Sequence, residues 1–151
     1  VIKPAISGGS YQTLQYHRHT MVEAEAHFKH LLHERDVLIQ PYVKSVEDYG
    51  ERALVVIDAK LTHAVRKQAR FMNDDEHVTG PVKCSAQERT LVDQVLKQFD
   101  VTPLYLRVDL TLNPSGKPWV MEVELIEPSL FFKQYPPALD LFVKALLKHL
   151  H

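Results

Sequence analysis

The 151-residue chain has 45% hydrophobic residues, 25% charged residues and a formal net charge of -1, a composition typical of a globular protein with one ordinary core. The near-neutral charge argues against a dedicated nucleic-acid-binding protein, and no apolar run approaches the length that crosses a bilayer. A single cysteine, Cys84, excludes an internal disulfide and fits the reducing cytoplasm. The chain opens with the residues VIKP and no methionine, so we expect it to be part of a longer protein whose N-terminal segment is missing.

The first third of the chain predicts short strands around one amphipathic helix. Residues 1–4 have the apolar character of a strand, and the Gly8-Gly9 pair indicates a turn after it. Residues 11–17 are compatible with a second strand. An apolar period of about 3.6 residues then predicts a helix with Thr20 as its N-cap.

The middle of the chain predicts a hairpin between two irregular segments. The apolar density of residues 36–43 (DVLIQPYV) predicts a buried strand that ends near its proline. Residues 44–51 (KSVEDYGE) are expected to be a polar loop. Residues 52–68 predict two strands joined by a tight turn at positions 58–60. Residues 69–85 show no period and are expected to form a mobile loop.

The C-terminal part gives the clearest local signals. Residues 85–99 predict a helix in which Ser85 and Glu88 form a capping box ahead of an apolar stripe. Residues 102–126 read as two strands around the turn sequence NPSG, which is typical of a type I turn. A second amphipathic helix is expected over residues 138–151. Because hairpins alternate with helices, the fold class is predicted to be α+β with antiparallel sheets.

The predicted hairpin carries its charges on one face. Side chains alternate along a strand, so Arg107 and Asp109 share a face of the first arm, and Glu122 and Glu124 share a face of the second. A turn centred on Pro114-Ser115 would place Arg107 opposite Glu122 and Asp109 diagonally from it. Diagonal neighbours lie roughly 7–8 Å apart, close enough for side chains to converge.

Three converging carboxylates need a compensating cation. Two unit charges 4 Å apart interact by roughly 4 kcal/mol at an effective dielectric near 20, more than one arginine offsets for the whole group. Mg²⁺ prefers oxygen ligands and is commonly held by one or two carboxylates and substrate phosphates. The hairpin therefore predicts a Mg²⁺ site shared with a phosphorylated ligand. The alternative is an ordinary solvated sheet face.

Other segments offer groups for such a ligand. Lys3 lies beside the glycine turn, where a point charge and backbone N–H groups can bind phosphate oxygens. Arg66 and Lys67 lie at the end of a predicted strand, as either phosphate ligands or a solvated basic end. The backbone of residues 38–43 (LIQPYV) leaves the predicted strand where it can pair with an adenine edge.

These segments together resemble the ATP-grasp superfamily. The resemblance rests on VIKPAISGGS, on LIQPYV followed by YGERALVVIDAKLTHAVRK, and on RVDLTLNPSGKPWVMEVELIEPSLFF, and it covers residues 1–133. The match is greatest to the branch with D-cycloserine ligase and the prokaryotic glutathione synthetases. It implies an ATP-grasp fold that lacks its N-terminal part, with residues 1–43 as the remainder of the N-terminal lobe and 44–151 as the C-terminal lobe.

The resemblance also assigns roles to individual residues. The nucleotide-binding residues would be Lys3, Gly8 and Gly9 for the phosphates, Gln40, Pro41, Tyr42 and Val43 for the adenine, and Glu51 for the ribose. The catalytic residues would be Lys67, which reaches the γ-phosphate, and Arg107, which stabilises the phosphoryl group in transfer. The metal ligands would be Asp109, Glu122 and Glu124, the last standing where many members carry Asn.

The implied function is ATP-dependent ligation of a carboxylate to an amine, in the cytoplasm, with ATP and Mg²⁺ or Mn²⁺ as cofactors. The carboxylate would be activated as an acyl phosphate before the amine attacks it. Partners would be small molecules and the missing segment of the same protein, with neither nucleic acid nor membrane involved. Two alternatives remain: a nucleotide-binding module without ligase chemistry, and an interaction domain whose acidic hairpin is only solvated surface.

Overall fold

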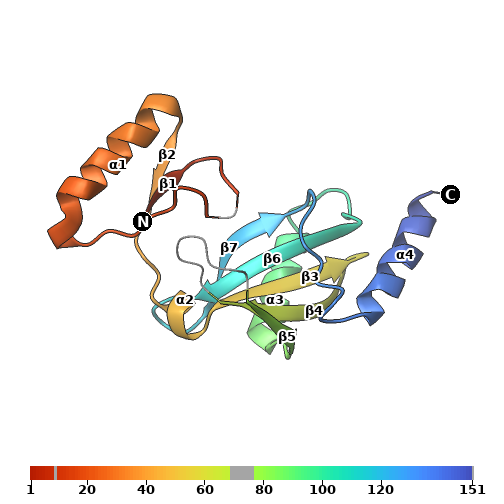
Figure 1. The fold of residues 1–151 in the computed structure, drawn as a ribbon. Coiled ribbons are helices and arrows are strands. Elements are labelled where there is room, and N and C mark those ends of the chain that lie inside the picture. The colour runs from red at the N-terminus through yellow and green to blue at the C-terminus, as the bar shows by residue number, and fades with distance from the viewer. Residues whose placement is uncertain (9, 69–76, 151) are drawn as a thin grey trace. The chain divides into compact units, whose positions relative to one another are not determined.

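The computed structural model describes residues 1–8, 10–68 and 77–150 (Figure 1). The chain divides into two compact units, one formed by Val1–Val43 and the other by the described residues from Lys44 onward. No helix in these described ranges is both long enough and apolar enough to span a membrane.

The first unit packs one helix against a two-stranded sheet. Its elements are β1 (Ile2–Pro4), the 3-10 helix η1 (Arg18–Thr20), α1 (Met21–Glu34) and β2 (Val37–Ile39). The two strands pair antiparallel, and Ile2, Ala24 and Leu31 form a small buried core between the strands and α1. The predicted helix after Thr20 is confirmed.

Two expectations for this unit are wrong. Residues 11–17 form no strand, because Leu14 pairs with Ile2 only as an isolated bridge. The strand predicted to be buried is short and open: Leu38 is 46% and Ile39 67% exposed. Apolar density alone predicted burial. The single helix leaves the face of the sheet that carries Leu38 uncovered, and Ile39, on the face with α1, borders an open hollow beside Met21 and Phe28.

The second unit is a five-stranded sheet with flanking helices. Its elements are α2 (Ser45–Asp48), β3 (Glu51–Ile57), β4 (Lys60–Lys67), β5 (Val78–Val82), α3 (Ala86–Leu96), β6 (Tyr105–Leu112), β7 (Pro118–Glu124) and α4 (Pro137–His149). The strand order is β5-β4-β3-β6-β7, and each neighbouring pair is antiparallel. The predicted α+β class with antiparallel sheets is therefore confirmed.

Local chemistry explains why these elements form. Asp58 and Ala59 join β3 to β4 with φ angles of 51° and 58°, the left-handed conformation that a two-residue hairpin turn requires. Ser85 accepts a hydrogen bond from the Glu88 N–H, and Glu88 accepts one from the Ser85 N–H, so the predicted capping box of α3 is confirmed.

The two faces of the sheet are covered differently (Figure 1). On one face, α3 buries an apolar core that includes Leu54, Val92 and Leu106. The other face is covered at one end by the segment before α4 and by α4 itself, which pack over Val55 and Ile57. The opposite end of that second face carries charged side chains in place of an apolar cover.

Two segments expected to be loops contain regular structure. Residues 45–48 form α2, a single helical turn that is too short to be predicted from helix propensity. Residues 78–82 form β5, which adds an edge strand to β4. The rest of the predicted 69–85 loop up to residue 76 lies outside the described residues.

The register of the β6–β7 hairpin also differs from the prediction. Arg107 pairs with Glu124 and Asp109 with Glu122, not Arg107 with Glu122. The turn is one residue longer than assumed, because the Asn113 N–H donates to the Lys117 carbonyl. Met121 then forms a bulge, since Asp109 opposes Glu122 while Leu110 opposes Val120. The longer turn and the bulge each shift the register by one residue. Because the total shift is two residues, Glu122 and Glu124 stay on the same face as Arg107 and Asp109.

Candidate functional site

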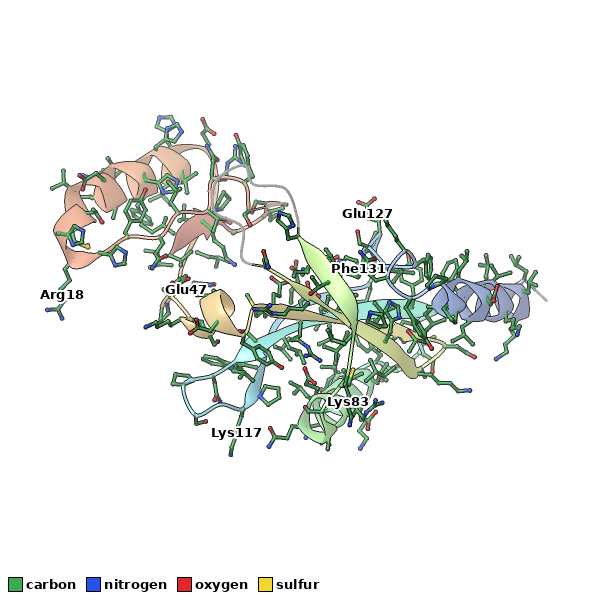
Figure 2. All side chains as sticks on the ribbon, turned by 60° about the horizontal axis from the view of Figure 1, so that its bottom comes forward. Arg18, Glu47, Lys83, Lys117, Glu127 and Phe131 are labelled. Carbon is green, nitrogen blue, oxygen red and sulfur yellow. The ribbon has the colours of Figure 1, made fainter. Side chains whose placement is uncertain are left out.

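Four adjacent strands bring charged side chains to one end of the open sheet face. Glu51 on β3 pairs across the ladder with Lys67 on β4. On the other side of β3, Asp109 on β6 pairs with Glu122 on β7. Alternation along each strand keeps these side chains on the same face. The segment that follows β7 lies nearby, and Figure 2 labels Glu127 and Phe131 in it.

The three predicted metal ligands converge. Ligand oxygens of Asp109, Glu122 and Glu124 lie within 4.8 Å of one another. Asp109 is 1% exposed, whereas Glu124 is half-buried and Glu122 exposed, so one side of the group is open to an incoming ion. The donors are all carboxylate oxygens, which suits a hard divalent cation such as Mg²⁺ and excludes a zinc site built on His and Cys. The residues present therefore fit the metal that the resemblance implies.

Lys67 is bound on both sides by carboxylates. Its Nζ donates to Oδ2 of Asp109 at 2.7 Å and forms an ion pair with Glu51. Lys67 is only 9% exposed. Burial disfavours the charged ammonium, but the neighbouring charges of Asp109 and Glu51 outweigh it and raise the pKa of Lys67. The ammonium is thus a fixed positive charge at the edge of the carboxylate group.

Arg107 is held from three directions. Its Nε and Nη2 each donate to Asp109 at 2.8 Å, and Nη2 also binds Glu124. The guanidinium carbon lies 5.6 Å from the centre of the Phe131 ring, a cation–π contact. Nη1 reaches the Ser129 carbonyl at 3.5 Å. The planar donor fork is therefore fixed beside the predicted metal ligands.

The carboxylates differ in protonation because their surroundings differ. Burial favours the protonated form of Asp109, but hydrogen bonds from Arg107 and Glu51 and the charge of Lys67 hold its pKa below the ordinary value. Burial and the hydrogen bond to Asp109 raise the pKa of Glu51 to about 7, against the opposing charge of Lys67. Burial likewise raises the pKa of Glu124. Four carboxylates meeting two cations leave an excess of negative charge that a divalent ion would neutralise.

The remaining predicted residues lie in the first unit. Lys3 is on β1 with Leu38 as its cross-strand partner, and Gly8 lies in the following turn, while Gly9 lies outside the described residues. Gln40 pairs with Val1 through both its N–H and its carbonyl, so its backbone is already used by the strand pairing. Pro41, Tyr42 and Val43 follow β2 and end the unit.

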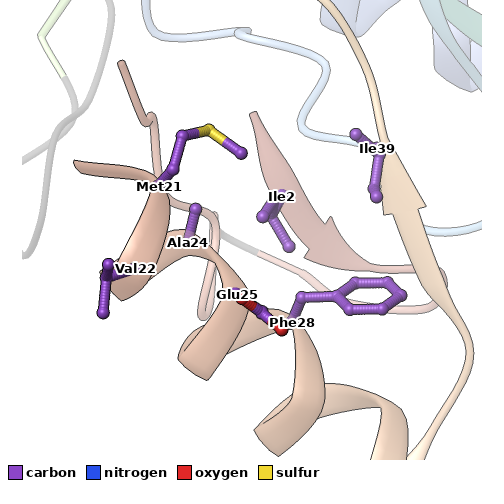
Figure 3. A pocket seen from close by; sticks show the side chains of 7 residues that line it. All are labelled: Ile2, Met21, Val22, Ala24, Glu25, Phe28 and Ile39. Carbon is purple, nitrogen blue, oxygen red and sulfur yellow. The ribbon is translucent and has the colours of Figure 1, made fainter. Parts of the chain in front are cut away.

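The first unit also contains a hollow of about 340 Å³ (Figure 3). Its lining is mostly apolar, from Ile2, Met21, Val22, Ala24, Phe28 and Ile39, with Glu25 at the edge. No cation is among these lining side chains, so this hollow is unsuited to phosphate.

Several neighbours of the site were not predicted. Thr111 is 1% exposed and donates from its hydroxyl to the Gly50 carbonyl at 3.3 Å. Phe131 lies against the Arg107 guanidinium and also packs on the apolar cluster around Val55 and Ile57. Arg66, predicted as a phosphate ligand or a solvated basic end, binds the backbone carbonyls of Asp48 and Tyr49. Such backbone contacts leave no periodic signal in a single sequence.

Comparisons with known proteins show which proteins this chain is similar to. No family model matches the chain. The cycloserine biosynthesis protein DcsG of Streptomyces lavendulae is 33% identical over 143 residues, an alignment that covers 86% of this chain and 48% of the relative. A crystal structure of D-cycloserine synthetase DcsG superimposes with a TM-score of 0.84 at 29% identity, covering 99% of this chain and 55% of that one.

More distant structures share the fold. The D-alanine–D-alanine ligase of Bacillus anthracis, solved with ATP, has a TM-score of 0.62 at 20% identity, covering 97% of this chain and 52% of that one. The ATP-grasp ligase PsnB, solved with a minimal precursor, Mg and ADP, has a TM-score of 0.60 at 17% identity, covering 95% and 45%. The chain has the ATP-grasp fold of these ligases and matches the C-terminal part of that fold. It spans about half the length of the relatives it matches.

Proposed function

We propose that this chain is the Mg·ATP-binding part of a ligase that activates a carboxylate as an acyl phosphate and joins it to an amine. The observation that carries the proposal is the convergence of three carboxylates, with oxygens within 4.8 Å, beside the fixed cations Lys67 and Arg107. Related ligases solved with ATP, or with Mg and ADP, support the same ligands here.

Asp109, Glu122 and Glu124 would hold Mg²⁺, or Mn²⁺, which neutralises phosphate charge when it is bound. Lys67 and Arg107 would bind the γ-phosphoryl oxygens and stabilise the charge that spreads over them in transfer. A substrate carboxylate oxygen attacks the γ-phosphorus, the bond to the β–γ bridging oxygen breaks, and ADP leaves. The amine then attacks the acyl carbon, and inorganic phosphate departs.

Residues of the first unit would complete nucleotide binding. We assign Lys3, Gly8 and Gly9 to the phosphates, Gln40, Pro41, Tyr42 and Val43 to the adenine, and Glu51 to the ribose. Gln40 would contribute its side chain, because its backbone N–H and carbonyl pair with Val1. Residues 1–43 would then be the remainder of one lobe, and 44–151 the other lobe, of a longer cytoplasmic protein that takes a small carboxylate and a small amine.

The test is calorimetric titration of the chain with ATP, with and without Mg²⁺. Binding should require Mg²⁺ and should be lost in Glu122→Gln, which removes one ligand charge from the exposed edge. Glu127→Gln is the matched control, because Glu127 is an exposed acid of the same region outside the three-carboxylate group. It should bind as the wild type does.

ATP binding that depends on neither Mg²⁺ nor Glu122 would refute the proposed metal–phosphate site. Mg²⁺-dependent binding without phosphate release, when carboxylates and amines are offered to the full-length protein, would favour the nucleotide-binding module instead.

A further inference from the structure

Arg66 lies next to Lys67 in the sequence but serves a different part of the molecule. Alternation along β4 turns its side chain away from the carboxylate group, to the face that carries α3. There its Nε donates to the Tyr49 carbonyl at 2.7 Å, and its Nη2 donates to the Asp48 carbonyl at 2.7 Å. Both carbonyls are at the C-terminal end of α2, where a cation also complements the backbone dipoles.

The turn that follows α2 fits closely against this side chain. Gly50 has a φ of +79°, a left-handed conformation that other residues rarely adopt. A Cβ atom at Gly50 would lie 2.8 Å from the Lys67 carbonyl and 3.0 Å from the Arg66 Nε. Gly50 is therefore held between the end of β4 and the Arg66 guanidinium, with no room for a side chain.

Two further bonds fix the same segment from the other side of β3. The Ser45 hydroxyl lies 2.9 Å from the Thr111 hydroxyl, and Thr111 donates to the Gly50 carbonyl at 3.3 Å. The backbone is thus tied to β4 through Arg66 and to β6 through Thr111. The next residue is Glu51, whose carboxylate contacts Lys67.

We propose that Arg66 is a positioning residue for nucleotide binding. By holding the carbonyls of Asp48 and Tyr49 it fixes the Gly50–Glu51 backbone, and so places the Glu51 carboxylate beside Lys67. The same contact holds the C-terminal end of α2. The inference rests on the nucleotide-binding function proposed above and adds to it a residue that touches neither metal nor phosphate.

The experiment compares three variants of the chain. Arg66→Ala removes both hydrogen bonds, and Arg66→Lys keeps the charge but loses the planar fork that reaches two carbonyls. Val92→Ala is the control for stability alone, because Val92 of α3 is fully buried in the apolar core on the sheet face opposite the carboxylate group. Amide hydrogen exchange and calorimetric Mg·ATP titration are measured on each.

In Arg66→Ala, amides of residues 49–52 should exchange at least tenfold faster, and the Kd for Mg·ATP should rise about tenfold. Arg66→Lys should have an amide exchange rate and a Kd between those of Arg66→Ala and the wild type. Val92→Ala should lower the Tm but leave the Kd within about twofold of the wild type. Unchanged exchange in Arg66→Ala, or a Kd increase equal to that of Val92→Ala, would overturn the positioning role.

The two proposals fail in distinguishable ways. If the wild-type chain binds no Mg·ATP, the proposed function fails and Arg66 has no nucleotide to position. If the wild type binds and Arg66→Ala binds equally well, only the role of Arg66 is refuted.

Discussion

Arg107 and Asp109 lie two residues apart on β6 and form a bidentate ion pair, with two guanidinium nitrogens each 2.8 Å from the carboxylate. The same carboxylate accepts a hydrogen bond from Lys67. Asp109 is therefore the common partner of both buried cations and also the most buried of the three predicted metal ligands. Its charge is therefore expected to affect both the stability of the fold and the proposed binding of a metal.

Replacing Asp109 with Asn should destabilise the second unit by about 3 kcal/mol, because two buried cations lose a shared anionic partner. Urea unfolding, followed by fluorescence of the single tryptophan, Trp119, measures the loss. The control is Glu122→Gln, at an exposed position, whose free energy of unfolding should change by no more than about 0.5 kcal/mol. Equal free energies of unfolding for the two variants would contradict the claim that Asp109 stabilises the fold as the shared partner of Lys67 and Arg107.

Mg²⁺ should stabilise the chain through the same group. A ligand at 100 times its Kd adds about 2.7 kcal/mol to the free energy of unfolding, which raises the Tm by about 5–10 °C for a protein of this size. Glu124→Gln removes one ligand charge and should weaken Mg²⁺ binding about tenfold, so the Tm curve shifts to higher Mg²⁺ concentrations. Thermal unfolding at increasing Mg²⁺ measures both effects. Identical curves for the wild type and Glu124→Gln would place the ion elsewhere.

His63 should make the fold sensitive to acid. It is 5% exposed, its ring centre lies 5.1 Å from that of Tyr135, and burial lowers its pKa although the Leu130 carbonyl opposes the shift. The unfolded chain takes up a proton near pH 6.5, whereas the folded chain does so only at lower pH. The contribution of neutral His63 to the free energy of unfolding is therefore fully present above pH 6.5 and is lost as the pH falls below that value.

Urea unfolding between pH 7.5 and 5 measures this dependence. His63→Gln should flatten it, whereas His149→Gln, at an exposed histidine of α4, should not. A wild-type pH profile that is unchanged in His63→Gln would assign the acid sensitivity to other groups.

The charged face could be predicted from the sequence because strand alternation has a fixed period. That Glu122 and Glu124 lie on the same face follows from that period alone. The prediction was therefore correct although the predicted register was wrong by two residues. The register itself depends on a five-residue turn and on the bulge at Met121. Neither is set by hydrophobic pattern, so a single sequence does not reveal them.

Contacts to the backbone were the least predictable part of the site. The segment 44–51 looked like a polar loop because α2 is too short to show a helical period. Its structure is stabilised by Arg66 and Thr111, which come from β4 and β6. The contact between Arg107 and Phe131 was equally unpredictable, because it depends on how the chain segment after β7 returns over the sheet. Interactions between residues far apart in sequence decide these positions.

The bulge at Met121 has a consequence for aligning this chain with its relatives. Met121 is an extra residue of β7, because Asp109 and Leu110 are adjacent on β6 while their partners Glu122 and Val120 are two residues apart. A homologue that lacks one residue at this point can therefore keep both glutamates on the charged face, with a regular ladder in place of the bulge. A single-residue gap here in an alignment should mark loss of the bulge and not loss of the carboxylate pair.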